Sequence, residues 1–166
     1  MNTPIISVIA ALDENRGIGY KGQIPWNIPA DRKWFYEKTK NHVVIVGKST
    51  YKSILEFLGH PLKDRLNIVL SDQKNYKVTG AIVVGSIEEA LALAKKKEKN
   101  GEIFFIGGGQ VYKKAISLAD RLYLTKVSGK FDADVYFPDY SKFKKVVYKE
   151  DVNSSNYKFT FLILEK

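Results

Sequence analysis

The sequence predicts an α/β fold with a mixed, largely parallel central sheet, an antiparallel C-terminal hairpin and helices on both faces. Apolar runs at residues 5–12, 43–46 and 102–106 have the composition of strands that are buried on both sides. Helical patterns alternate with these runs, and only strands follow in the last part of the chain. No repeat, low-complexity tract or linker divides the sequence, so we expect a single domain over residues 1–166.

Local signals place the remaining elements in order. A polar loop over residues 13–23 contains three glycines and could be either a lid or a plain surface connection. Pro29 suits the first position of a helix that should end near Lys40. Ser86 and Glu89 have the spacing of a capping box, which predicts a helix that Asn100-Gly101 stops. The other expected elements are strands at 66–70, 81–84, 121–127, 145–150 and 157–165, and helices at 50–57 and from 107–109 to 119.

Composition limits the classes of function. With 166 residues, of which 45% are hydrophobic, the chain can form a folded domain with a sizeable core. The absence of cysteine excludes disulfides and a cysteine nucleophile, and it fits the cytoplasmic location that we expect. We find no signal-peptide pattern or membrane-spanning apolar run, so we expect no membrane partner. The net charge of +9 favours anionic ligands, but no nucleic-acid-binding module is evident, so we expect no nucleic-acid partner.

The sequence favours chemistry that a bound nucleotide supplies. His42 and His60 are the only histidines and lack partners at metal-ligand spacing, so we expect no metal, and no Ser-His-Asp or G-x-S-x-G arrangement occurs. Gly47 and Gly107 each follow a buried strand and precede a helix, a junction at which main-chain N–H groups suit a phosphate. Neither junction has Walker A or Rossmann spacing, but the two could hold two phosphates of one nucleotide that acts in hydride transfer.

Asp31 is the candidate acid. It lies in the first turn of the predicted helix, on or near a face that carries Trp34 and Phe35. A carboxylate among aromatic side chains needs partners or becomes neutral, and one interpretation is a functional acid. The alternative is a partly exposed residue that complements the helix dipole, and spacing alone does not decide between the two.

Several motifs, in their order and spacing, resemble those of dihydrofolate reductase over nearly the whole chain. The resemblance implies NADPH-dependent reduction of dihydrofolate to tetrahydrofolate in one-carbon metabolism, binding of antifolate inhibitors, and a monomer. The motifs are Ile9-Ala10-Ala11 with Gly17-Ile18-Gly19, Pro25-Trp26-Asn27-Ile28-Pro29-Ala30-Asp31 with Phe35, Gly47-Lys48-Ser49-Thr50-Tyr51-Lys52-Ser53-Ile54, Pro61-Leu62 with Arg65, Ile106-Gly107-Gly108-Gly109 with Tyr112, and Tyr123-Leu124-Thr125.

The resemblance also implies residue roles on the substrate side. Asp31 resembles the family's acid, which orients the pterin ring and helps its nitrogen to gain a proton, and Thr125 resembles the residue that supports it. Arg65 resembles the arginine that holds a carboxylate of the glutamate tail. The implied substrate-binding residues are Ile9, Ala10, Asp31, Phe35, Ile54, Leu62, Arg65, Ile106, Tyr112 and Thr125.

On the cofactor side, the glycines at 107–109 would let the pyrophosphate approach the main chain. The implied cofactor-binding residues are Ala11, Ile18, Gly19, Gln23, Ile24, Gly47, Lys48, Ser49, Thr50, Ser71, Asp72, Gly107, Gly108, Gly109, Gln110 and Val111.

Some positions depart from the family pattern, and other functions stay open. Arg32 stands where the family often has an apolar residue, which predicts a more basic rim of the pocket. Lys48 and Gln110 replace arginines that hold NADPH phosphates in some members, and His60 replaces an arginine that assists tail binding. The alternatives are another pterin- or flavin-pathway NADPH reductase on the same fold and a basic nucleic-acid-binding protein.

Overall fold

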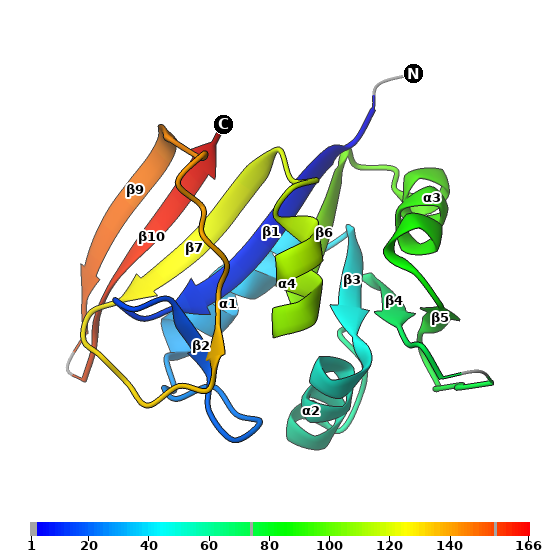
Figure 1. Ribbon diagram of the computed structural model, residues 1–166, viewed down its shortest axis with the longest axis horizontal. Helices are drawn as coiled ribbons and strands as arrows, with labels where there is room; N and C mark the ends of the chain where they lie inside the picture. Colours follow the sequence, from blue (N-terminus) through cyan, green and yellow to red (C-terminus); the bar gives the residue numbers. More distant parts are fainter. Residues whose placement is uncertain (1–2, 74, 155) are drawn as a thin grey trace.

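The computed structural model describes residues 3–73, 75–154 and 156–166 and contains an eight-stranded sheet in the order β5-β4-β3-β6-β1-β7-β10-β9 (Figure 1). The strands from β5 to β7 in that order pair in parallel, and β10 pairs antiparallel with both β7 and β9. This arrangement confirms the predicted fold class. The strands are β1 (Ile5–Leu12), β3 (Val43–Gly47), β4 (Leu66–Leu70), β5 (Ile82–Val84), β6 (Glu102–Gly107), β7 (Arg121–Val127), β9 (Lys145–Asn153) and β10 (Lys158–Glu165).

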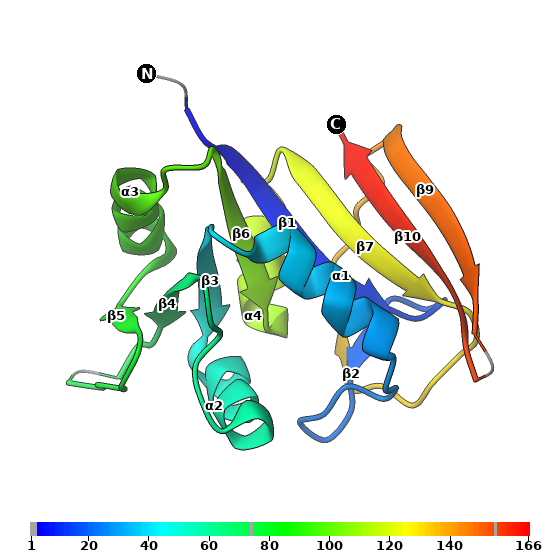
Figure 2. The ribbon, with the colours of Figure 1, turned by 180° about the vertical axis from the view of Figure 1, so that it is seen from behind.

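Two apolar cores cover the two faces of the sheet. Figures 1 and 2 show α4 on one face and α1 on the opposite face. Side chains along β1 point alternately to the two faces, so this strand contributes to both cores. Val8 and Leu12 pack with α3 and α4, whereas Ile9 packs with Trp34 of α1 and Tyr51 of α2. The helices are α1 (Pro29–Thr39), α2 (Lys48–Leu58), α3 (Ile87–Lys97) and α4 (Gly109–Ala115).

The third helix ends two residues before its predicted end near Lys99. Ser86 caps α3 as expected, since its hydroxyl oxygen accepts from the Glu89 N–H at 3.1 Å. The helix ends at Lys97, because Glu98 takes an extended conformation. Its carboxylate then accepts from the main-chain N–H groups of Val43 and Asn100, both at 2.7 Å. The bond from Val43 ties the end of α3 to the start of β3.

Other boundaries also differ from the predicted ones. The helix expected over 50–57 begins at Lys48, and the one expected to reach 119 ends at Ala115. The strand expected over 145–150 extends to Asn153, because its pairing with β10 continues to that residue. The bounds of β1, β4 and β7 are as predicted.

The segment 13–23 is not only a loop. It contains β2 (Gly17–Gly19), which pairs with β8 (Val135–Tyr136) in a second, two-stranded sheet. Close packing explains the glycine at position 17, since a Cβ there would lie 2.8 Å from the Cβ of Ala133. Sequence periodicity missed both strands because they are only two or three residues long and pair across more than 100 residues.

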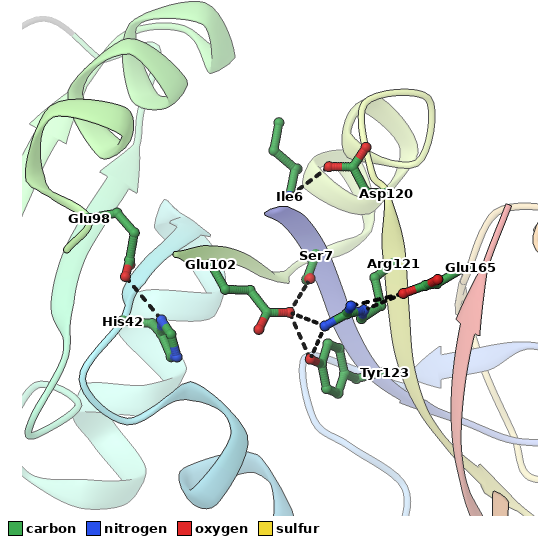
Figure 3. A network of polar contacts seen from close by, with 9 residues as sticks. All are labelled: Ile6, Ser7, His42, Glu98, Glu102, Asp120, Arg121, Tyr123 and Glu165. Atoms are coloured by element: carbon green, nitrogen blue, oxygen red, sulfur yellow. Dashed lines mark hydrogen bonds and ion pairs between the residues drawn. The ribbon is translucent and has the colours of Figure 1, made fainter. Parts of the chain in front are cut away.

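A polar network links four strands at the end of the sheet where β1, β6 and β7 begin (Figure 3). Oε2 of Glu102 accepts from the Ser7 hydroxyl at 2.6 Å and from the Tyr123 hydroxyl at 2.7 Å. Arg121 lies 3.5 Å from the same oxygen and donates to Glu165 of β10 at 2.9 Å. Because Ser7 and Tyr123 are buried, each lost hydrogen bond should cost free energy of unfolding.

Tyr123→Phe is therefore expected to lower the free energy of unfolding by about 1–2 kcal/mol. Chemical denaturation followed by circular dichroism measures this loss. Tyr148→Phe is the matched control, because the Tyr148 hydroxyl also bonds a carboxylate, that of Glu150 at 2.7 Å, but on the exposed edge of the sheet. An equal loss in both variants would show that burial does not set the strength of the network.

Candidate functional site

Asp31 and Thr125 form the centre of the candidate site. Asp31 lies in the first turn of α1, and Thr125 lies in β7 with 1% of its surface exposed. The Thr125 hydroxyl donates to Oδ1 of Asp31 at 2.6 Å, although 94 residues separate the two. Burial raises the pKa of Asp31, while the hydrogen bond from Thr125 and the charge of Arg32 lower it. A largely buried acid with a partner on another strand favours the functional role over simple complementation of the helix dipole.

Apolar side chains surround this acid on the α1 face of the sheet. The core on that face includes the buried Ile9, Leu62 and Ile106, and the partly buried Phe35 and Ile54 pack against it. The structure therefore brings these five predicted substrate-binding residues to the face of the sheet that carries α1.

Three predicted residues belong to the other core. Ala10, Val111 and Tyr112 are buried on the opposite face of the sheet, which α3 and α4 cover. The Ala10 side chain points away from the α1 face, because neighbours along a strand point to opposite faces of the sheet, and Val111 lies in α4, which covers the opposite face. Any ligand contact of Ala10 at this site would have to come from its main chain.

Tyr112 ties two strands together beside the acid. Its hydroxyl lies 2.8 Å from the carbonyl oxygens of both Ile9 and Ile106, which belong to the neighbouring strands β1 and β6. Burial raises the pKa of Tyr112 strongly, and the charge of Asp31 raises it further. The hydroxyl therefore stays protonated and holds the carboxyl ends of β1 and β6 in register.

The two glycine junctions meet, as their predicted joint role requires. β3 pairs with β6 in parallel, so Gly47 and Gly107 end neighbouring strands. A Cβ on Gly47 would lie 3.5 Å from the main-chain nitrogen of Gly108. A Cβ on Gly108 would lie 2.6 Å from Oγ1 of Thr50, so only glycine fits there. The first turn of α2, which contains Lys48 and Ser49, therefore borders the turn that leads into Gly109 and Gln110.

The predicted cofactor-binding residues are spread along one edge of the sheet. Ser71 and Asp72 follow β4, Gly47 ends β3, Gly107 ends β6, and Ala11 lies near the end of β1. These four strands are neighbours in that order, and strands ~4.8 Å apart give a row of ~14 Å, which suits an extended dinucleotide. Ala11 pairs directly with Thr125, so the last position in the row lies beside the acid.

Sequence reasoning missed two residues at the far end of this row. A hollow of about 380 Å³ lies there, and it is lined by Ser71, Asp72, Gln73, Asn75, Tyr76, Val83, Val84 and Gly85. The ammonium of Lys48 lies 4.5 Å from the ring centroid of Tyr76 and donates to the side-chain oxygen of Gln73. Tyr76 and Gln73 belong to a polar segment without periodicity, so no sequence signal marked them. A second hollow, of about 440 Å³, lies over β7, β10 and β9 and contains none of the predicted site residues.

The implied cofactor-binding residues between positions 18 and 24 differ in their contacts and exposure. Ile18 packs against the α4-side core, and Gly19 belongs to β2. Gln23 closes a tight turn with Tyr20 through two main-chain hydrogen bonds of 2.8 and 3.0 Å. Ile24, another of the implied cofactor-binding residues, is 63% exposed.

Arg65 lies on the same side of the molecule as the apolar walls. Its guanidinium carbon is 5.5 Å from the ring centroid of Phe35 and 5.2 Å from that of Tyr36. Nη1 donates to the hydroxyl of Thr39 at 3.1 Å, and Nε donates to the Lys63 carbonyl at 2.8 Å. These contacts leave Nη2 without a hydrogen-bond partner among the described residues, so it can bind an external anion.

The described part of the chain holds neither a metal-binding cluster of side chains nor a membrane-spanning helix. There, His, Asp and Glu side chains form no group of three or more that could hold a metal ion. None of the helices within residues 3–73, 75–154 and 156–166 has the length and apolar character needed to cross a membrane.

Replacing Arg32 is expected to change the pKa of Asp31. Arg32 lowers the pKa of Asp31, so Arg32→Leu should raise that pKa further above its ordinary value. Carboxyl-carbon NMR of the free protein measures the change. Lys33→Leu removes the same charge from the next residue of α1, where the side chain is 77% exposed, and is expected to leave the pKa of Asp31 almost unchanged. Equal shifts in both variants would show that Arg32 acts only through net charge.

Comparisons with known proteins agree with this geometry. A family model described as dihydrofolate reductase matches residues 5–166. Dihydrofolate reductase from Bacillus subtilis (strain 168) is 36% identical over 166 residues, which cover 98% of this chain and 95% of that protein. The enzyme of the same name from Buchnera aphidicola subsp. Acyrthosiphon pisum (strain APS) is 40% identical over 164 residues, with 95% and 98% covered. The solved structure of dihydrofolate reductase from Enterococcus faecalis, complexed with NADP(H) and RAB-propyl, has a TM-score of 0.87 and 31% identity, with 97% and 95% covered.

Proposed function

The chain belongs to the dihydrofolate reductase family, and from that membership we propose that it reduces 7,8-dihydrofolate to 5,6,7,8-tetrahydrofolate with NADPH. The observation that carries this proposal is the hydrogen-bonded pair of Asp31 and Thr125 beside Ala11, where the cofactor row ends. At that point Asp31, which would bind the substrate, lies next to the end of the proposed cofactor site. A hydride transfer needs this proximity of its two reactants.

Asp31 orients the pterin ring. In its ionised form, the carboxylate accepts paired hydrogen bonds from an amino group and a ring nitrogen of the pterin. The Thr125 hydroxyl already donates to Oδ1, which fixes the rotation of the carboxylate toward the site. Burial raises the pKa of Asp31 in the direction of neutral pH, so this carboxyl group can help the reacting pterin nitrogen to gain a proton.

The cofactor side fits NADPH. The glycines at 107–109 and Gly47 leave no room for side chains where the two junctions meet, so main-chain N–H groups can approach phosphates there. Lys48, Ser49 and Thr50 would hold the phosphates, and Ser71 with Tyr76 would border the adenosine end. When bound, NADPH supplies the hydride. The residues of the chain bind it, align it along the sheet edge and keep its reactive end beside Asp31.

The tail of the substrate would reach Arg65. A guanidinium pairs with a carboxylate through two parallel hydrogen bonds, which a lysine cannot reproduce. The stacking of Arg65 on Phe35 and Tyr36 holds it in place for this contact. We propose that residues 1–166 form a single catalytic domain that acts as a monomer in the cytoplasm. We also propose that antifolates bind in place of the substrate.

A single assay tests the proposed function. The near-ultraviolet absorbance of NADPH is followed after the protein and dihydrofolate are added. We expect a decay that needs both substrates and that an antifolate stops. If the folded, NADPH-binding protein gives no decay, the activity is that of another pterin- or flavin-pathway reductase. Steeply salt-dependent binding of DNA without any stabilisation by NADPH would instead favour the nucleic-acid-binding alternative.

A further inference from the structure

Arg32 is a cation that the proposed reaction does not yet use. It follows the acid in α1, and its Nη1 donates to the side-chain oxygen of Asn27. Its guanidinium carbon lies 5.9 Å from the ring centroid of Phe57, in the last turn of α2. The side chain therefore reaches from α1 toward α2, although Phe57 is 72% exposed and offers no buried place to pack.

Arg32 and Arg65 lie along one edge of α1. Residues three and four apart on a helix are neighbours, so Arg32 is next to Phe35 and Tyr36, on whose rings Arg65 stacks. One helical turn advances ~5.4 Å along the axis, so Arg32 lies about one turn from the rings on which Arg65 stacks. Both arginines thus connect α1 to the segment between β3 and β4 that contains α2.

Neither arginine forms a close ion pair among the described residues, although Asp31 acts on Arg32 and Asp64 acts on Arg65 at longer range. Within the part of the chain that the structure describes, no carboxylate lies within ion-pair distance of Arg32 or Arg65. The contacts with Asn27 and Phe57 restrict the rotation of Arg32 and use only some of its five donors. A guanidinium that is already held in place loses less entropy when it binds an anion.

We propose that Arg32 is a specificity-determining residue that binds a carboxylate of the substrate's glutamate tail, together with Arg65. The proposal rests on the proposed function and adds a second cation to its substrate site. A glutamate tail carries two carboxylates and longer tails carry more, so two cations along one helix edge favour the tailed substrate over the pterin alone.

Arg32 could instead act only through the charge that it places next to Asp31. That effect reaches the pterin ring and is the same for every substrate that contains the ring. The two roles therefore separate when kcat/KM for dihydrofolate is divided by kcat/KM for dihydropteroate, which has the same ring and lacks the glutamate. Effects transmitted through Asp31 cancel in this ratio.

The experiment compares Arg32→Leu, Arg32→Lys and the control Lys33→Leu with the unchanged protein. For Arg32→Leu we expect the KM for dihydrofolate to rise about five- to tenfold, with the KM for dihydropteroate within about twofold. A substrate with additional glutamates should show a larger rise, and added salt should reduce the difference. Arg32→Lys should recover part of the loss, and Lys33→Leu should cause none. A ratio that Arg32→Leu leaves unchanged, or that Lys33→Leu lowers equally, overturns the proposal.

A binding measurement keeps the inference separate from the reaction. The fragment p-aminobenzoylglutamate carries the tail without the pterin, and p-aminobenzoate lacks the glutamate. NMR titration should show that Arg32→Leu weakens binding of the first about fivefold and leaves the second unchanged. If Arg32→Leu has this effect on fragment binding but the unchanged protein does not oxidise NADPH with dihydrofolate, the tail site stands and the proposed function fails. Equal binding of p-aminobenzoylglutamate by both proteins overturns the tail site.

Discussion

Asp31→Asn is expected to lower kcat/KM for dihydrofolate about 100-fold or more at neutral pH. Asparagine keeps an oxygen that can accept from the Thr125 hydroxyl, so the local geometry should survive. It loses the charge that pairs with the pterin and the capacity to take part in proton transfer. NADPH oxidation, measured over a range of pH, should show partial recovery at lower pH, where the substrate arrives already protonated.

The same variant should fold and bind NADPH normally. Burial raises the pKa of Asp31, so over the range between the unfolded and folded pKa values the folded state binds more protons. The stability that this group contributes is therefore lost as pH rises through that range, and ionised Asp31 opposes folding at neutral pH. Denaturation should show that Asp31→Asn is no less stable than the unchanged protein. Asp132→Asn, an exposed acid in the loop before β8, is the activity control. Turnover near normal for Asp31→Asn at neutral pH would rule out the assigned role.

Arg65→Ala is expected to weaken dihydrofolate binding by about 2–3 kcal/mol, which corresponds to roughly 30- to 150-fold, and to leave NADPH binding unchanged. The loss follows because the substrate carboxylate would lose a bidentate partner. Calorimetry or quenching of protein fluorescence measures both dissociation constants.

Two comparisons make the Arg65 result specific. Arg65→Lys keeps the charge and should recover only part of the affinity, since a lysine cannot donate in parallel. Dihydropteroate should bind both variants almost as it binds the unchanged protein. Equal weakening of dihydrofolate and NADPH would mean that Arg65 supports the fold through Thr39 and the Lys63 carbonyl rather than binding the tail.

The proposed catalytic pair, Asp31 and Thr125, shows how much of the site the sequence could predict. Helical spacing placed Asp31 among aromatic residues, but the residues around it did not reveal its partner. Only the resemblance to a known family named Thr125, and the structure places it 2.6 Å from the acid. Similarly, the glycine junctions were visible as separate motifs, and the parallel pairing of β3 with β6 makes them one surface.

The sequence by itself determined the fold class, the bounds of β1, β4 and β7, and the residue types that suit an acid and a phosphate-binding turn. These features are local, because apolar runs, capping residues and glycines act on their own neighbours in the chain. The tertiary structure alone decided the pairing of β2 with β8, the early end of α3 at Glu98 and the place of Tyr76 beside Lys48. Each of these depends on contact between segments that are distant in sequence, and such contacts leave no periodic pattern in either segment.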